Sequence, residues 1–174
     1  MDLEEALRLL RGQYHDFLNH LQIVSGLVDL GRTDKIKDAV RRAAGEFETR
    51  GRVAKMGLTE VSWALLLLQM DAVPAGLKVS CELEKALVES GVPNAAVLRK
   101  LHAAMISRVS GTGREWPLKI TGRNVPGGYA LTYAGPWDWR EIIETVGDAA
   151  ADSGSSFELG GENAVTVVLQ PGER

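Results

Sequence analysis

The segment from Arg11 to Gln22 brings a histidine, a carboxylate and an amide close together in the sequence: His15, Asp16 and Asn19. Asn19 lies four residues after His15 and three after Asp16, so on a helix the three side chains can converge above one patch of surface. A neutral imidazole is a nucleophile near pH 7, and a carboxylate beside it can accept a proton or fix its tautomer. The amide can orient a water molecule or a partner's acidic group. The segment predicts that His15 is reactive; the alternative is a solvated His–Asp pair without chemistry.

The remaining histidines and the cysteine give weaker signals. His15 and His20 are about 140° apart around a helix, whereas two zinc-binding histidines on one helix need a spacing of four residues. His102 falls inside a later predicted helix, where we expect it to pack. Cys81 is the only cysteine, which excludes an internal disulfide and a multi-cysteine zinc site. A reducing cytoplasm fits this cysteine content best.

A long amphipathic helix must position His15. From Leu3 to Val28 the apolar residues recur in alternating steps of four and three, a pattern typical of a coiled-coil or bundle seam. About 27 residues make a rod of roughly 40 Å, which needs a second helix of similar length. Gly31 can end the first helix and Thr33 can cap the next, which predicts an antiparallel hairpin. The predicted seams are Leu3, Leu7, Leu10, Tyr14, Phe17, Leu21, Val24 and Val28, then Ile36, Val40, Ala43, Phe47, Ala54 and Leu58.

A single hairpin would leave apolar surface uncovered. Leu9, Leu18, Ile23 and Leu27 widen the apolar side of the first helix, while Arg50 and Gly51 interrupt the second seam. We therefore expect a homodimer in which two hairpins form a four-helix bundle. Burial of the first seam is worth on the order of 10 to 20 kcal/mol per chain before conformational entropy is subtracted.

The periodicity changes after Gly57, and the rest of the chain predicts an α/β sandwich with a mixed or antiparallel sheet covered on one face by helices. The fold class is therefore α+β, with a helical hairpin at 1–58 and an α/β domain at 59–174. Pro74 is expected to end the first helix of this domain. The expected elements are helices at 60–73, 94–109 and 137–150 and strands at 77–83, 118–121, 129–133 and 165–169.

Composition excludes several classes of protein. Hydrophobic residues make up 45% of the chain and charged residues 25%, values typical of a globular protein. The longest apolar stretch is well short of the roughly 20 residues that span a bilayer, and the first residues do not read as a secretory signal. A net charge of −3 gives no reason to expect a nucleic-acid partner.

The run from Leu10 to Gly31 closely resembles the phosphoacceptor helix of the sporulation initiation phosphotransferase B family. The same H-D-[FW]-x-N-x-L-Q pattern occurs in citrate- and fumarate-sensing histidine kinases. This resemblance implies that His15 is phosphorylated, that Asp16 and Asn19 support it, and that the hairpins form a dimeric four-helix bundle. It also implies exchange of the phosphoryl group with an aspartate on a response-regulator receiver domain.

The expected partner-binding residues on this helix are Arg11, Leu18 and Gln22. The chain is expected to need no cofactor of its own, because the receiver would supply Mg²⁺ and its acidic pocket. The second helix is rich in basic residues, which predicts either a solvated face or a surface that steers an acidic receiver toward His15. These residues are Arg32, Lys35, Lys37, Arg41, Arg42, Arg50, Arg52 and Lys55.

From about Val61 to Gln170 the order of elements resembles, more weakly, the ATP-binding domain of histidine kinases. Such a domain needs helical asparagines for magnesium and a D-x-G-x-G loop for adenine. The helix over 97–108 contains no asparagine, and the loop position reads Tyr-Ala-Gly-Pro-Trp over 133–137. The partly similar stretch at 152–156 follows the last helix, in the wrong place. We therefore predict that the domain does not bind ATP.

The sequence favours a dimeric cytoplasmic phosphotransferase of a two-component phosphorelay, of the sporulation type, in which His15 receives a phosphoryl group from one receiver aspartate and passes it to another. Two alternatives stay open. The first is a non-enzymatic dimeric adaptor that binds receivers, and the second is an ATP-dependent histidine kinase with an unusual nucleotide loop.

Overall fold

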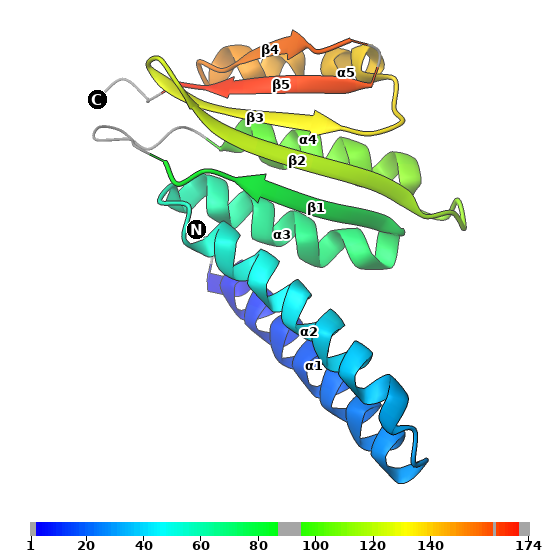
Figure 1. Ribbon diagram of the computed structural model, residues 1–174. Coiled ribbons are helices and arrows are strands. Elements are labelled where there is room, and N and C mark those ends of the chain that lie inside the picture. The colour runs from blue at the N-terminus through cyan, green and yellow to red at the C-terminus, as the bar shows by residue number, and fades with distance from the viewer. Residues whose placement is uncertain (1–2, 87–94, 162, 171–174) are drawn as a thin grey trace. The chain divides into compact units, whose positions relative to one another are not determined.

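Two compact units make up the chain, Met1–Gly51 and Arg52–Arg174. The first is a pair of helices, and the second is a sheet with helices on one face (Figure 1). This architecture confirms the predicted fold class, a helical hairpin followed by an α/β sandwich. The computed structural model describes residues 3–86, 95–161 and 163–170.

The hairpin consists of helix α1 (Leu3–Asp29) and helix α2 (Thr33–Ala54). Between them Gly31 adopts a φ of 64°, a left-handed conformation that glycine reaches without the clash a Cβ would cause. It ends α1 as predicted. Thr33 is the first residue of α2 rather than the residue before it, and its hydroxyl donates to the carbonyl of Gly31 over 3.5 Å.

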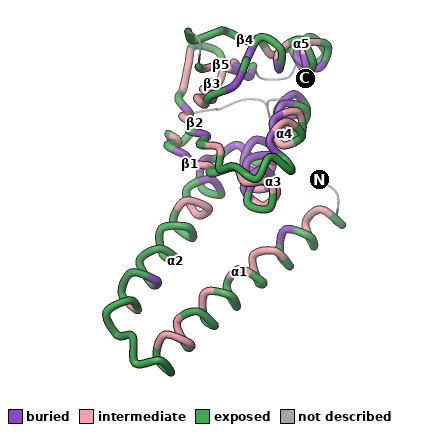
Figure 2. The backbone as a smooth tube through the Cα atoms, turned by 90° about the vertical axis from the view of Figure 1, so that its right-hand side faces the viewer, coloured by how far each residue is buried: buried purple, intermediate pink, exposed green. Residues whose placement is uncertain are grey.

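The predicted seam of α1 is exposed rather than packed against α2. Figure 2 shows both helices exposed along most of their length. Within one chain, the prediction that this seam meets α2 holds for Phe17, whose ring contacts that of Phe47, but not for most of the seam, because the covered face of α1 lies largely beside it and is partly polar. The exposed seam residues are Leu3, Leu7, Leu10, Tyr14, Phe17, Leu21 and Val28. The covered or half-covered residues between Leu9 and Leu27 include Leu9, Gln13, Asp16, His20, Val24 and Leu27.

The described part of the second unit contains three helices and five strands. They are α3 (Thr59–Ala75), β1 (Leu77–Leu83), α4 (Ala96–Val109), β2 (Trp116–Val125), β3 (Gly128–Ala134), α5 (Trp139–Asp152), β4 (Ser156–Leu159) and β5 (Ala164–Leu169). The sheet order is β1-β2-β3-β5-β4, with β1 parallel to β2 and every other pair antiparallel. Helices α3, α4 and α5 lie along one face (Figures 1 and 2).

Three details differ from the sequence prediction. Strand β4 was not expected, because Ser156–Leu159 is a four-residue edge strand whose side chains are largely exposed. Helix α3 continues through Pro74 and ends at Gly76, whose φ of 78° forms the C-cap. A Cβ on Gly76 would lie 2.8 Å from the Arg114 carbonyl oxygen. The predicted start of the next helix at Asn94 lies outside the described residues.

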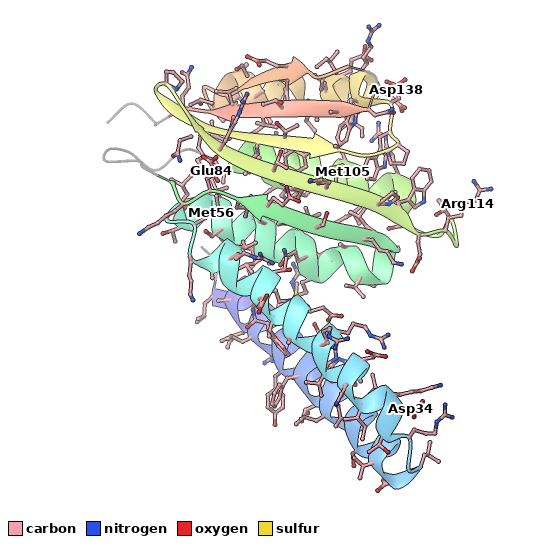
Figure 3. All side chains as sticks on the ribbon, in the orientation of Figure 1. Asp34, Met56, Glu84, Met105, Arg114 and Asp138 are labelled. Carbon is pink, nitrogen blue, oxygen red and sulfur yellow. The ribbon has the colours of Figure 1, made fainter. Side chains whose placement is uncertain are left out.

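The core of the second unit lies between the sheet and its helices. Leu118 and Ile120 on β2 are fully buried. So is Met105 on α4, which Figure 3 labels. Asp138 caps α5, where its carboxylate accepts hydrogen bonds from the backbone N–H groups of Arg140 and Glu141. None of the helices described is both long and apolar enough to cross a bilayer.

Candidate functional site at His15

His15 lies on the exposed side of α1, with 75% of its side chain accessible. The amide nitrogen of Asn19 lies 3.2 Å from Nδ1 of the ring, and a carboxylate oxygen of Asp16 lies 3.9 Å from the same atom. The structure thus brings together the three residues that the sequence singled out. Neither of these contacts involves Nε2.

Asp16 is turned toward α2, although its neighbour His15 faces solvent. Its Oδ2 atom accepts a hydrogen bond from Nη2 of Arg50 over 2.6 Å, an ion pair between residues 34 positions apart. Sequence reasoning placed Arg50 only among the basic residues and noted that it interrupts an apolar seam. That interruption was the sequence signal for this ion pair. A cation that is covered at a seam position needs an acidic partner, and the facing helix can provide one.

His20 belongs to the contact between the two helices rather than to the His15 cluster. Its Nε2 atom lies 3.1 Å from a carboxylate oxygen of Glu46, and its ring meets that of Phe47 edge to face at 5.8 Å between centroids. Phe17 meets the same Phe47 ring at 6.2 Å. His15 and His20 therefore point to different surroundings, and the described residues hold no group of three His, Cys, Asp or Glu suited to a metal ion.

The predicted partner-binding residues Arg11, Leu18 and Gln22 are all exposed. Counted with His15 they follow one another in steps of four, three and four, so they share one face of α1. Most of the basic side chains of α2 are exposed as well, with Arg50 the half-covered exception. Recognition of a partner through these residues stays a prediction.

The sequence of the hairpin matches a known family. Residues 1–56 match the family described as the alpha-helical domain of SpoOB-type sensor kinases. The match covers both helices of the hairpin. The resemblance carried by the phosphoacceptor helix is thereby confirmed.

Three solved structures illustrate the wider likeness. The histidine kinase AdeS of Acinetobacter baumannii is 13% identical with a TM-score of 0.39, over 91% of this chain and 98% of that one. A bacterial phosphotransferase is 11% identical with a TM-score of 0.39, over 97% of both chains. The histidine kinase ThkA in complex with the response regulator TrrA is 12% identical with a TM-score of 0.42, over 94% of this chain and 61% of that one. All three TM-scores are below 0.5, and no curated protein matches the sequence.

In the second unit, the loop after β3 contains Trp137, which contacts two other tryptophan rings. Trp137 stacks on Trp116 at 6.2 Å between centroids and meets Trp139 edge to face at 5.3 Å. Gly135 allows this arrangement, because a Cβ there would lie 1.7 Å from the Trp137 ring. This is the position at which the sequence reads Tyr-Ala-Gly-Pro-Trp. At this position the Trp137 ring therefore packs against two other indole rings, while the lack of ATP binding stays a prediction.

Two buried side chains of the second unit, His102 and Cys81, could be mistaken for catalytic residues. Nε2 of His102 lies 2.9 Å from the Tyr133 hydroxyl, and burial lowers the pKa of His102 from 6.5 to about 3. The Cys81 thiol accepts a hydrogen bond from the Gln69 amide over 3.5 Å, and burial raises its pKa to about 11. A neutral imidazole and a protonated thiol, both covered, are core residues, as the sequence predicted for His102.

Proposed function

We propose that this protein is a homodimeric, cytoplasmic phosphotransferase of a two-component phosphorelay, in which His15 takes a phosphoryl group from one receiver aspartate and gives it to another. The observation that carries the proposal is the exposed imidazole, held through Nδ1 on a SpoOB-type helix with Nε2 open to a partner. Asp16 and Asn19 are the supporting residues. Residues 1–58 would perform dimerisation and transfer, and residues 59–174 would not bind ATP.

The proposed transfer needs few groups from this chain. The Nε2 lone pair of His15 attacks phosphorus, the bond from phosphorus to the receiver's carboxylate oxygen breaks, and that oxygen leaves as part of a carboxylate. For Nε2 to keep its lone pair, the ring proton must lie on Nδ1. Nδ1–H can then donate a hydrogen bond to the side-chain oxygen of Asn19, once the amide group has turned by 180°. Asp16 stabilises the positive charge that develops on the ring. The receiver supplies Mg²⁺.

A second copy of the chain is the proposed occupant of the exposed apolar stripe on α1. The stripe keeps steps of three and four from Leu3 to Val28, as one helix of a bundle requires, and Tyr14 within it is 66% exposed. On α2, Val40 and Phe47 are exposed too. Each large side chain buried contributes about 1.5 to 3 kcal/mol, which makes a self-complementary pairing of two hairpins favourable.

Dimerisation is tested by sedimentation velocity on the full chain. Leu10→Glu and Leu21→Glu should each shift the protein to monomer and lower the helical circular dichroism signal. The matched control is Val73→Glu, which changes an even more exposed apolar residue on α3 and should leave the dimer intact. A monomeric wild-type protein at tens of micromolar would contradict the proposal.

Transfer is tested with a receiver domain that carries a radioactive phosphoryl group on its aspartate. Wild-type protein should gain acid-labile label on His15, His15→Gln should gain none while staying dimeric, and His20→Gln should be labelled normally. Receiver binding and normal cellular function of His15→Gln would favour the adaptor alternative. Autophosphorylation of the full chain from radioactive MgATP would favour the kinase alternative.

A further inference from the structure

Arg50 differs from the other arginines of α2 because its guanidinium group is largely covered. Its side chain is 17% exposed, whereas that of Arg41, which pairs with Asp38 on its own helix, is 77% exposed. A charged group that leaves water needs a partner of opposite charge. The partner of Arg50 is Asp16 on α1, at 2.6 Å between Nη2 and Oδ2.

The Asp16 carboxylate uses its two oxygens differently. Oδ2 accepts from Arg50, and Oδ1 is the oxygen 3.9 Å from Nδ1 of His15. A carboxylate is planar, so a guanidinium group that fixes one oxygen also restricts where the other can lie. The three side chains form an ordered series, Arg50 to Asp16 to His15.

We infer that Arg50 is a positioning residue for the phosphoryl chemistry of His15, acting through Asp16. This inference rests on the proposed function, because the position of the His15 ring matters only if His15 is phosphorylated. Arg50 holds Oδ1 on the Nδ1 side of the ring, where the negative charge favours a proton on Nδ1 and leaves the lone pair on Nε2. Because Asp16 already balances its charge, Arg50 is a poor ligand for the phosphoryl group itself.

A purely structural role is the competing explanation, since the Asp16–Arg50 pair also joins α1 to α2. Another contact between these helices can test that explanation. His20 and Glu46 form a second polar contact between the same helices, one turn later on α1 and one turn earlier on α2. Glu46→Gln weakens that contact without touching Asp16, so it measures what a lost link between the helices costs.

The decisive experiment is a double-mutant cycle in the initial rate at which phosphoramidate phosphorylates His15, mapped by mass spectrometry on the full dimeric chain. Phosphoramidate needs no partner protein: its P–N bond breaks, ammonia leaves, and the new P–N bond forms to the ring. Arg50→Met should lower the rate roughly tenfold, within the range of couplings in one salt-bridge network. In an Asp16→Asn background it should have no further effect.

Arg50→Lys should recover part of the rate, while Arg41→Met and Glu46→Gln should react as wild type. A wild-type rate for Arg50→Met, or an undiminished loss in the Asp16→Asn background, would overturn the inference. An equal loss in Glu46→Gln would also do so, because it would assign the effect to the link between the helices.

A second readout is the tautomer of the neutral His15 ring, measured by ¹⁵N NMR. Arg50→Met and Asp16→Asn should both shift the ring proton from Nδ1 toward Nε2, and a shift in Asp16→Asn alone would contradict a role for Arg50. The experiments distinguish failure of the Arg50 inference from failure of the proposed function. If the phosphorylated receiver labels His15 but Arg50→Met behaves as wild type, only this inference fails. If the receiver labels nothing, the proposed function fails and the NMR measurement still tests Arg50.

Discussion

Acidification should destabilise the second unit through His102. This side chain on α4 is 4% exposed, and its Nε2 atom lies 2.9 Å from the hydroxyl of Tyr133 on β3. Burial lowers the pKa of His102 from 6.5 to about 3, and a backbone hydrogen bond with Ala64 opposes only part of that effect. Burial also raises the pKa of Tyr133, so the hydroxyl stays neutral and offers no charge to a protonated ring.

The sign follows from where each state binds the proton. In the folded chain the His102 ring stays neutral down to about pH 3, whereas in the unfolded chain it is protonated below pH 6.5. The stabilising contribution is complete above pH 6.5 and is lost as the pH falls from 6.5 toward 3. Within this window each pH unit is worth about 1.4 kcal/mol, so a change from pH 7.5 to pH 5.0 should cost about 2 kcal/mol through this residue.

The assay is equilibrium unfolding in urea at several pH values between 7.5 and 5.0, followed by tryptophan fluorescence. All four tryptophans lie in the second unit, so this signal reports on the unit that contains His102. His102→Gln removes the ionisable ring, and its free energy of unfolding should depend less steeply on pH than that of the wild type. The exposed His15→Gln serves as the matched control and should keep the wild-type slope. Parallel pH dependences for wild type and His102→Gln would refute the reasoning.

Three further predictions concern the same unit. Cys81, whose pKa burial raises to about 11, should resist a thiol reagent at pH 8 in the folded protein and react once urea unfolds it, and rapid labelling of the native chain would contradict this. Gly135→Ala should lower the free energy of unfolding by about 1 to 3 kcal/mol because its methyl group overlaps Trp137, whereas Gly147→Ala, an open helical position, should raise it by about 0.5 to 1 kcal/mol. Asp138→Ala should cost about 1 kcal/mol in urea unfolding through the lost cap of α5, and an unchanged midpoint would count against the cap.

Periodicity predicted both helices of the hairpin and its turn at Gly31, because a long apolar repeat has few competing explanations. It did not predict which neighbour the repeat faces. A stripe of apolar residues looks the same in sequence whether α2 or a second chain covers it. The contacts Asp16–Arg50 and His20–Glu46 on the covered face depend on the register of two helices, which no local pattern encodes.

In the second unit, too, sequence patterns predicted some elements and missed others. Its buried strands alternate clearly, but β4 has four residues, two of them polar, and reads as a turn. Pro74 is the penultimate residue of α3; local patterns predict a break there, yet the helix includes it and continues to Ala75 before Gly76 ends it. At the candidate site, residue type and spacing predicted that His15, Asp16 and Asn19 would converge. The contact between Arg50 and Asp16 could be identified only from the structure.

The arrangement on α1 explains why one helix can serve two purposes. Successive residues of an α-helix are about 100° apart, so Asp16 can lie on the covered face while His15 points outward and Phe17 belongs to the apolar stripe. If the apolar stripe packed against α2 instead, Asp16 would turn away from Arg50 and no apolar surface would remain for a second chain. Because α2 contacts α1 mainly beside the apolar stripe, neighbouring residues can play three different parts. Asp16 is anchored by Arg50, His15 stays exposed, and Phe17 belongs to the surface proposed for dimerisation.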